Sequence, residues 1–212
     1  MSKIEVRITR PFGPSIANTK MPDELVNKLN DYVDSVIKDE EKSKKQDWGN
    51  KLAGHVKQEF RLEHDFIKSS GFMDFLANAV SNWIKMSEKK QITKFNMIES
   101  WVVRQFKNEY NPVHWHNGHI SGVGYLKLPK TFGKLPQDKG ENNQNGKIDL
   151  IHGNKMFLQN SKFSIHPELG QFYFFPNYMM HTVYPFTDSD EERRSISFNA
   201  LIDDNIYNVY RG

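Results

Sequence analysis

Three histidines are the residues of this sequence best suited to hold a metal ion. His114 and His116 are separated by one residue, and side chains two apart on a strand point to the same face. Both imidazoles can then reach one ion, although such pairs also occur as ordinary surface residues. A third histidine, His181, follows the aromatic pair Phe174–Phe175, and a barrel would bring it beside the other two. A core histidine satisfied by a backbone carbonyl is the competing interpretation of His181.

A second group of polar residues lies in the segment Arg193–Asn199. On a strand, Arg193, Ser195 and Ser197 share one face, and Ile196 and Phe198 share the other. If the polar face looks into a barrel, the arginine needs an anionic partner, because an unpaired buried charge is costly. A small dicarboxylate would supply that partner. Arg193 can grip a carboxylate with two parallel hydrogen bonds, and the Ser195 hydroxyl can add a third.

The composition limits both the domain count and the chemistry. With 212 residues, 37% of them hydrophobic, the chain is long enough for one good core, so we expect a single domain over residues 1–212, divided into a strand with supporting helices (1–92) and a barrel core (93–212). No cysteine is present, which excludes disulfides, thiolate metal sites and cysteine nucleophiles. Histidine, aspartate and glutamate remain as ligands for iron, zinc or manganese.

Charge and the N-terminus say little about partners. The 29 basic and 26 acidic side chains are spread along the chain, so the net charge of +3 gives no clear nucleic-acid signal. Residues 1–11 lack the apolar stretch of a signal peptide or membrane span, and we therefore expect a soluble, cytoplasmic protein with no membrane partner.

The N-terminal part must supply the support for this chemistry. Residues 4–8 alternate as a half-buried strand does, and residues 11–14 form a turn. From Pro22 a helical stripe begins, made of Leu25, Leu29, Tyr32, Val33 and Val36. Residues 38–47 form a charge run, which we interpret as a linker. A second amphipathic helix is expected over residues 72–83, with Gly71 just ahead of it.

After residue 93 the pattern changes to short apolar bursts separated by Gly, Pro and Asn, which is typical of antiparallel sheets. A long polar segment, residues 130–146, is expected to be a surface loop. Helices followed by many strands predict an α+β, mainly β fold, in which a double-sheet barrel is backed by N-terminal helices. The strands are expected at residues 95–106, 113–116, 120–128, 147–151, 162–165, 171–175 and 193–201.

These features together resemble the 2-oxoglutarate and iron(II)-dependent oxygenase superfamily, and most closely a branch of small oxygenases found in bacteria and phages. The resemblance spans residues 95–202 and covers the N-terminal helices only loosely. It implies a double-stranded β-helix, also called a jelly-roll or cupin-like barrel, and a bacterial cytoplasmic setting, with a phage gene as one source. The motifs that carry it, in order, are His114-Trp115-His116-Asn117-Gly118-His119-Ile120-Ser121-Gly122-Val123-Gly124-Tyr125-Leu126, then Phe175-Pro176 with His181, then Arg193 to Asn199.

The resemblance also implies roles for individual residues. His114, His116 and His181 would hold iron(II), leaving three positions for 2-oxoglutarate and dioxygen. The distal carboxylate of 2-oxoglutarate would meet Arg193 and Ser195, and Tyr125 could add its hydroxyl. Arg194 is the fallback anchor, because a shift of one residue in strand phase exchanges the two arginines. The expected reaction is hydroxylation of a substrate while 2-oxoglutarate and dioxygen become succinate and CO₂.

One departure from the superfamily keeps alternatives open. The usual second ligand is a carboxylate, and this chain has His116 there, which leaves the site one unit more positive. Three-histidine sites also occur in cupin dioxygenases that need no co-substrate, so a cupin-like metal enzyme without 2-oxoglutarate is one alternative. A non-catalytic barrel with incidental histidines is another. Arg193 and Ser195 favour the 2-oxoglutarate enzyme.

Some conspicuous residues are given ordinary roles. Five could line an apolar substrate pocket but fit core packing better: Trp101, Val103, Trp115, Phe172 and Phe174. Met179 and Met180 are expected to pack beside the third ligand. His119, His152 and His166 are expected to face solvent from loops. In barrel enzymes the loops recognise the substrate, and no loop of this sequence has a diagnostic pattern, so the primary substrate stays open. The oligomeric state stays open as well.

Overall fold

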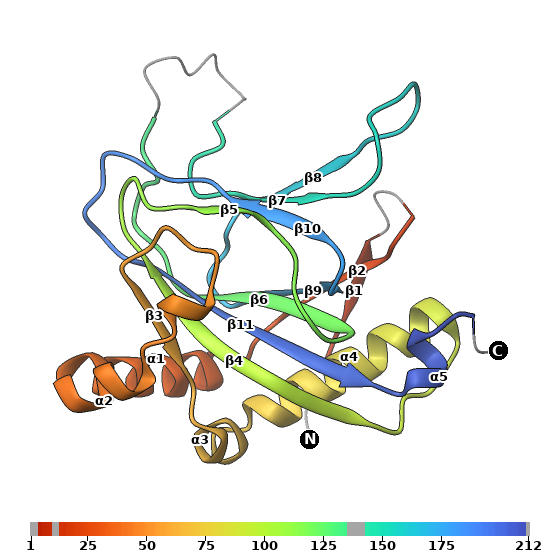
Figure 1. Cartoon of the computed structure of the whole chain (residues 1–212), viewed down its shortest axis with the longest axis horizontal. Helices are drawn as coiled ribbons and strands as arrows, with labels where there is room; N and C mark the ends of the chain where they lie inside the picture. The colour runs from red at the N-terminus through yellow and green to blue at the C-terminus, as the bar shows by residue number, and fades with distance from the viewer. Residues whose placement is uncertain (1–3, 10–12, 135–142, 211–212) are drawn as a thin grey trace.

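Two β-sheets face one another, and helices cover the outer side of the larger sheet (Figure 1). The computed structural model describes residues 4–9, 13–134 and 143–210. The larger sheet has the strand order β1-β2-β9-β6-β11-β4-β3, and the smaller one has the order β5-β10-β7-β8. All pairings within them are antiparallel. This is the α+β, mainly β double-stranded β-helix that the sequence predicts, although its two sheets do not close into a continuous barrel.

The strands of the larger sheet come from both ends of the chain. They are β1 (Arg7–Thr9), β2 (Ile16–Lys20), β3 (Gln58–Arg61), β4 (Phe95–Gln105), β6 (Ile120–Lys127), β9 (Gln171–Pro176) and β11 (Arg193–Ile202). The smaller sheet consists of β5 (Asn111–His114), β7 (Ile148–Ile151), β8 (Lys162–Ile165) and β10 (Met180–Val183).

Two long helices pack on the outer face of the larger sheet. Helix α1 (Asp23–Lys38) buries Leu25, Leu29 and Val33, and α4 (Phe72–Glu88) buries an aromatic and aliphatic stripe that includes Phe75 and Trp83. They meet apolar side chains from the outward faces of four strands, among them Val102, Leu126, Phe172, Phe174, Ile196 and Phe198. Between the sheets lies a second buried cluster, with Val123, Tyr125, Leu150, Phe175 and Val183. Both sides of the central strands are therefore buried.

Several expectations for the N-terminal part need correction. The predicted linker over residues 38–47 is a helix, α2 (Glu40–Gln46), because the Asp39 side chain caps it and Glu40 pairs with Lys44 one turn on. The opening strand is shorter and later than residues 4–8. Strands β2 and β3 and the short helices η1 (Gly49–Lys51), α3 (His64–Ser69) and α5 (Asp204–Tyr207) were not predicted.

The later predictions agree more closely with the structure. Six of the predicted strands match β4, β6, β7, β8, β9 and β11 to within two residues, but β5 ends at His114 instead of His116, and β10 was missed. In the predicted loop, residues 135–142 lie outside the described part. The division at residue 92 stays a prediction.

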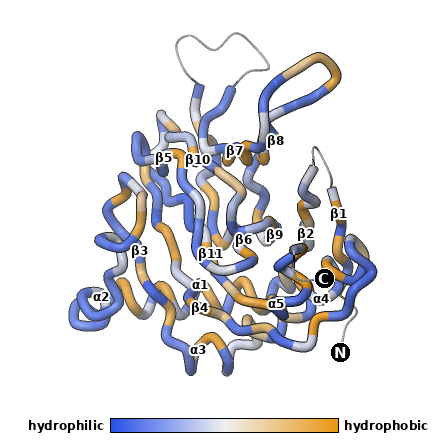
Figure 2. Tube along the Cα trace, turned by 45° about the vertical axis from the view of Figure 1, so that its right-hand side comes forward, coloured by the Kyte–Doolittle hydropathy of each residue, from blue (hydrophilic) through white to orange (hydrophobic). Residues whose placement is uncertain are grey.

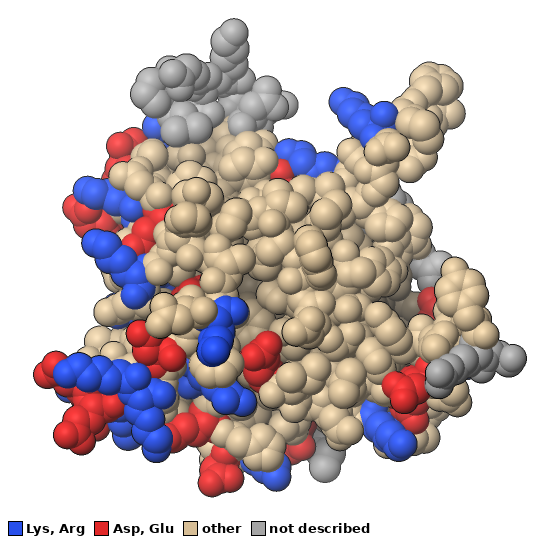
Figure 3. Space-filling view, viewed as in Figure 1, with Lys and Arg blue, Asp and Glu red and all other residues tan. Residues whose placement is uncertain are grey.

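The surface adds three observations. Basic and acidic side chains are intermixed along the side formed by α1 and α2 (Figure 3). The hairpin between β7 and β8 projects from the molecule, and its hydrophobic tip exposes Phe157 and Leu158 (Figure 2). Among the described residues, no helix is both long enough and apolar enough to cross a membrane.

A buried charge cluster holds β11 against α1 and β4. Glu192 accepts hydrogen bonds from Arg194 Nε at 2.7 Å and from Arg104 Nε at 2.7 Å, and Arg194 also reaches Asp34 at 2.7 Å. Burial raises the pKa of Glu192, but the hydrogen bonds and charges of Arg194 and Arg104 outweigh it and lower that pKa to about 2. Glu192 thus stabilises the fold as a carboxylate.

We therefore predict that Glu192→Gln lowers the free energy of unfolding at pH 7 by about 3–5 kcal/mol, because Arg104 loses its carboxylate and Arg194 loses one of its two. The folded-state pKa is below the unfolded one, so the stabilisation is full above pH 4.5 and is lost as the pH falls toward 2. Urea unfolding measured across that pH range tests this. The exposed Glu41→Gln serves as control, and a Glu192→Gln penalty that persisted unchanged at pH 3 would contradict the prediction.

Candidate metal and co-substrate site

The three predicted histidines lie together between the two sheets. His114 is the last residue of β5, His116 follows two residues later, and His181 is on β10, directly paired with His114. One nitrogen from each ring lies within 4.8 Å of the others, and His116 Nε2 is 3.2 Å from His181 Nε2. Three imidazole nitrogens at this spacing can coordinate one transition-metal ion on a single face.

Backbone contacts orient two of these rings. His114 Nδ1 lies 2.7 Å from the Pro112 carbonyl, and His181 Nδ1 lies 2.9 Å from the Met179 carbonyl. In each case Nδ1–H donates to the carbonyl, so Nε2 keeps its lone pair for a metal. The alternative prediction for His181 was a core histidine satisfied by a backbone carbonyl. The Met179 carbonyl does bind one ring nitrogen, but the other ring nitrogen remains free to bind a metal.

Burial keeps the cluster neutral. It lowers the pKa of His116 to about 2, with the positive charges of His181 and His114 as smaller causes. It also lowers the pKa of His181 to about 3 and shifts that of His114 downward. Neutral imidazole is the form that binds metal, so the site is ready for metal at neutral pH.

The inner face of the larger sheet forms the opposite wall of this narrow cavity. Arg193, Ser195 and Ser197 on β11 line it together with Trp101 and Val103 on β4, while Asn111, Val183 and Phe175 complete it. Ser195 pairs with Tyr125 on β6, so the Tyr125 side chain lies on the same face. The register thus brings the three predicted co-substrate residues together.

Arg193 is buried without a carboxylate. Its side chain is 1% exposed, and its one hydrogen bond within the described residues runs from Nη1 to Gln105 Oε1 at 2.9 Å. Gln105 is oriented for this contact, because its amide donates to the Glu109 and Tyr184 carbonyls. Burial lowers the pKa of Arg193, and the Tyr125 ring lies 5.1 Å from the guanidinium.

Polar atoms around this arginine are left without protein partners. Arg193 Nε, Arg193 Nη2 and the Tyr125 hydroxyl are buried and make no hydrogen bond to a described residue. Burial raises the pKa of Tyr125 to about 12, so the hydroxyl keeps its proton and can donate. A small anion such as a carboxylate would give these buried donors the acceptor that the described residues do not supply.

Arg194 has the opposite environment. It lies on the other face of β11 and is bonded to Glu192, Asp34 and Asn30, all within 3.3 Å. Its charge is therefore already balanced by protein carboxylates.

The remaining sequence expectations divide. Trp101 and Val103 line the cavity, and Phe172 and Phe174 pack in the core beneath α4. Trp115 is 66% exposed and does neither, because it lies in the turn after β5. Met179 is buried as expected, but Met180 points outward from the strand and is 40% exposed.

The three histidines assigned to solvent also differ. His119 is buried, stacked on Tyr207 at 3.9 Å, and accepts a hydrogen bond from the Ile202 backbone, so its assignment was wrong. His152 is half-buried and His166 is exposed. Sequence reasoning missed Gln105 and Asn199. Extension of the polar alternation Arg193-Ser195-Ser197 along β11 would have indicated Asn199, whereas Gln105 shares its face of β4 with the apolar Trp101 and Val103 and has no such signal.

A mainly β double-stranded β-helix with a histidine cluster between its sheets defines a class of metal-dependent enzymes. Comparison with known proteins narrows that class. Residues 99–199 match a family model described as "Putative 2OG-Fe(II) oxygenase". No curated protein matches the chain.

Solved structures share the fold. A prolyl-4-hydroxylase from Pseudomonas putida aligns with a TM-score of 0.58 and 14% identity, covering 87% of this chain and 91% of that one. The epimerase SnoN of nogalamycin biosynthesis aligns with a TM-score of 0.56 and 12% identity, and the alignment covers 86% of this chain and 76% of SnoN. A viral collagen prolyl hydroxylase from Paramecium Bursaria Chlorella virus-1, in complex with 2-oxoglutarate, aligns with a TM-score of 0.51 and 15% identity. This alignment covers 86% of this chain and 94% of the viral one.

The chain is similar to the 2-oxoglutarate and iron(II)-dependent oxygenases over residues 99–199, the part that contains the three histidines and Arg193. It is an oxidoreductase whose metal is iron(II) and whose co-substrates are 2-oxoglutarate and dioxygen.

The two arginines generate a stability prediction. We expect Arg193→Met to leave the metal-free protein at least as stable as the wild type, because it removes a buried cation that no carboxylate balances. Arg194→Met should lower the free energy of unfolding by about 3–5 kcal/mol, because the buried Glu192 loses one of its two arginine partners and Asp34 loses its own. Urea unfolding without metal or 2-oxoglutarate measures both. Equal losses in the two variants would contradict the assignment of Arg193 as unbalanced.

Proposed function

We propose that this chain is a hydroxylase that inserts one atom of dioxygen into a C–H bond of its substrate. The second oxygen atom enters 2-oxoglutarate, which loses CO₂ and becomes succinate. The observation that carries the proposal is Arg193, a buried cation on the inner face of the larger sheet, opposite the histidine cluster. Two of its nitrogen atoms have no hydrogen-bond partner among the described residues.

His114, His116 and His181 are the proposed iron ligands. Bound there, iron(II) would supply the activation of dioxygen that protein side chains cannot perform. The protein keeps the three rings neutral by burial and fixes two of them through the Pro112 and Met179 carbonyls. His116 replaces the family's usual carboxylate, so the cluster brings no negative charge to the metal.

Arg193, Ser195 and Tyr125 are the proposed anchor for the distal carboxylate of 2-oxoglutarate. The free nitrogens of Arg193 offer two donors, the Tyr125 hydroxyl offers a third, and Ser195 lies between them on the same face. Gln105 acts through Arg193, because it holds one edge of the guanidinium. Arg194 is unsuited, since its own carboxylates already surround it.

The other candidate functions explain less. A cupin-like three-histidine enzyme without 2-oxoglutarate would leave Arg193 with no counter-charge, and a non-catalytic barrel would leave both Arg193 and the neutral histidine cluster without a role. Epimerisation is a different outcome of similar chemistry, as the name of SnoN illustrates. A product heavier than substrate by one oxygen atom separates hydroxylation from epimerisation.

Anaerobic titration of iron(II) and 2-oxoglutarate, followed by the visible charge-transfer absorption, tests the site. Arg193→Ala should weaken 2-oxoglutarate binding at least about thirtyfold, because a buried charge pair loses one partner at a cost of about 2 kcal/mol or more. Calorimetry of metal binding alone is the control and should match the wild type. Unchanged 2-oxoglutarate affinity in Arg193→Ala would rule out this anchor.

Replacement of His116 tests the unusual ligand. His116→Asp restores the family's usual carboxylate, so we expect iron binding and succinate release to persist. Loss of an outer-shell partner lowers metal affinity by up to about a hundredfold, and loss of a direct ligand should cost no less. We therefore expect His116→Ala to lower iron affinity by at least about a hundredfold. His166→Ala, at an exposed histidine, is the matched control. Iron affinity of His116→Ala equal to that of the control would exclude His116 as a ligand.

We also propose that the enzyme works in the cytoplasm of a bacterial cell, where 2-oxoglutarate is available as a metabolite. Cell fractionation with an antibody to the chain tests this location.

A further inference from the structure

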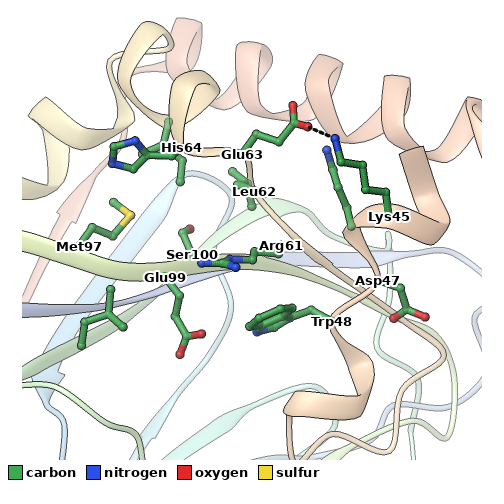
Figure 4. Close-up of a pocket in the computed structure, with 13 residues that line it drawn as sticks. Lys45, Asp47, Trp48, Arg61, Leu62, Glu63, His64, Met97, Glu99 and Ser100 are labelled. Atoms are coloured by element: carbon green, nitrogen blue, oxygen red, sulfur yellow. Dashed lines mark ion pairs between the residues drawn. The ribbon is translucent and has the colours of Figure 1, made fainter. Parts of the chain in front are cut away.

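A pocket at the β3 edge of the larger sheet is lined by five charged side chains, and two of them, Arg61 and Glu99, have opposite sign and are not paired with each other. It lies between α3 and the segment after α2, next to the last residue of β3 and to residues 97–100 of β4 (Figure 4). Trp48, Arg61 and Glu99 line it, and the strand registers place Arg61 and Glu99 on the face toward the smaller sheet. Within the described residues, neither Arg61 nor Glu99 forms an ion pair.

Glu99 is held in place from behind. The Ser121 hydroxyl donates to Asn199 Oδ1 at 2.8 Å, and Asn199 Nδ2 donates to Glu99 Oε1 at 3.0 Å. Ser121 and Asn199 are 1% and 2% exposed, so this chain of hydrogen bonds is rigid and protected from water. Glu99 Oε2 makes no hydrogen bond to a described residue and remains available to accept one from a ligand.

Arg61 is held by an aromatic surface. Its guanidinium carbon lies 4.7 Å from the centre of the Trp48 ring, and no described residue accepts a hydrogen bond from it. Stacking orients the guanidinium plane while leaving its N–H groups free for an acceptor.

Both side chains adjoin the reaction centre through Trp101. Arg61 pairs directly with Trp101 across β3 and β4, and Glu99 lies two residues before Trp101 on the same face. The Trp101 ring is 5.4 Å from the His116 ring. Arg193 lies at the other end of this face, opposite Gln105, so the pocket and the 2-oxoglutarate anchor occupy opposite ends.

We infer that this pocket binds the primary substrate through an amino-acid unit, either free or within a polypeptide. Glu99 accepts a hydrogen bond from the ammonium or amide nitrogen, and Arg61 donates to the carboxylate or carbonyl oxygen. The inference rests on the proposed function, since it names the substrate class of the same site.

The spacing and the signs of charge favour this class. Arg61 and Glu99 are diagonal neighbours on β3 and β4, and such neighbours have Cβ atoms about 7–8 Å apart. Their side chains can therefore bind the nitrogen and the oxygen of one amino-acid unit, which are a few bonds apart. Glu63 of the same pocket is paired with Lys45 at 3.9 Å, so a nucleotide phosphate would meet the negative charges of Glu99 and Asp47 against the single unpaired cation Arg61. A simple cation would be repelled by Arg61.

The test uses the protein loaded with iron(II) and 2-oxoglutarate and measures succinate release above the rate without substrate. Three probes are compared: an equimolar mixture of the free L-amino acids, a mixture of random decapeptides with blocked ends, and a mixture of ribonucleoside monophosphates. We expect one of the first two to stimulate release and to yield a product heavier by one oxygen atom. The blocked peptides distinguish a polypeptide source from a free amino acid.

Variants then test the two side chains. Glu99→Gln and Arg61→Ala should raise the KM for the active mixture at least about tenfold, the loss expected for a hydrogen bond to a charged group. Glu99→Asp should recover part of that loss. Glu168→Gln, at an exposed acid outside the pocket, is the control. The absorption band with iron(II) and 2-oxoglutarate verifies that each variant is folded.

The inference would be overturned if only the nucleotides, or none of the probes, stimulated succinate release. It would also be overturned if the KM of Glu99→Gln equalled that of the control variant. A failure of the proposed function looks different, because then neither succinate release nor the absorption band would be observed in the wild type.

Discussion

Arg193 is a cation enclosed by protein, and the arrangement of the surrounding sheet keeps it there. It is 1% exposed, and among the described residues only Gln105 bonds to it. Taking an unbalanced guanidinium out of water costs several kcal/mol, so the fold must supply that energy elsewhere. Strand β11 can do so because it is hydrogen-bonded on both sides, to β4 and β6, and packed on both faces. Such a cost is typical of a functional site, where a ligand completes what the protein leaves open.

The two-residue period of β11 joins the core to the site. Ile196, Phe198 and Ala200 pack beneath the helices, while Ser195, Ser197 and Asn199 face the smaller sheet. Helix packing therefore fixes the direction of the polar residues, although no residue of a described helix lines the cavity that holds the histidines. The histidines come from the smaller sheet, so the distance between them and Arg193 depends on the apolar cluster between the sheets, including Val123, Leu150 and Val183. Loosening that cluster would alter the site without touching any polar residue.

The sequence was informative wherever a single periodicity governs the outcome. The alternation in residues 193–199 gave the correct face for Arg193, and the His-x-His spacing together with the family resemblance identified a cluster that the structure brings within 4.8 Å. It was less informative where tertiary contacts decide. The charged run at residues 40–46 became a helix through an N-cap and an ion pair, and His119 became buried because α5 folds back over it. Glu99 looked like any strand glutamate, because its orientation depends on Asn199, far away in sequence.

The neutral histidine cluster has a consequence for the charge of the loaded enzyme. In the proposed site, iron(II) would bring two positive charges, Arg193 one, and 2-oxoglutarate two negative ones. The filled cavity would then keep a net charge of about +1, where a two-histidine, one-carboxylate site would be neutral. In a buried cavity that excess attracts small anions strongly. With the proposed ligands, chloride, azide and similar ions would compete at the metal site, and the activity would depend on the kind of salt in the buffer as well as on its concentration.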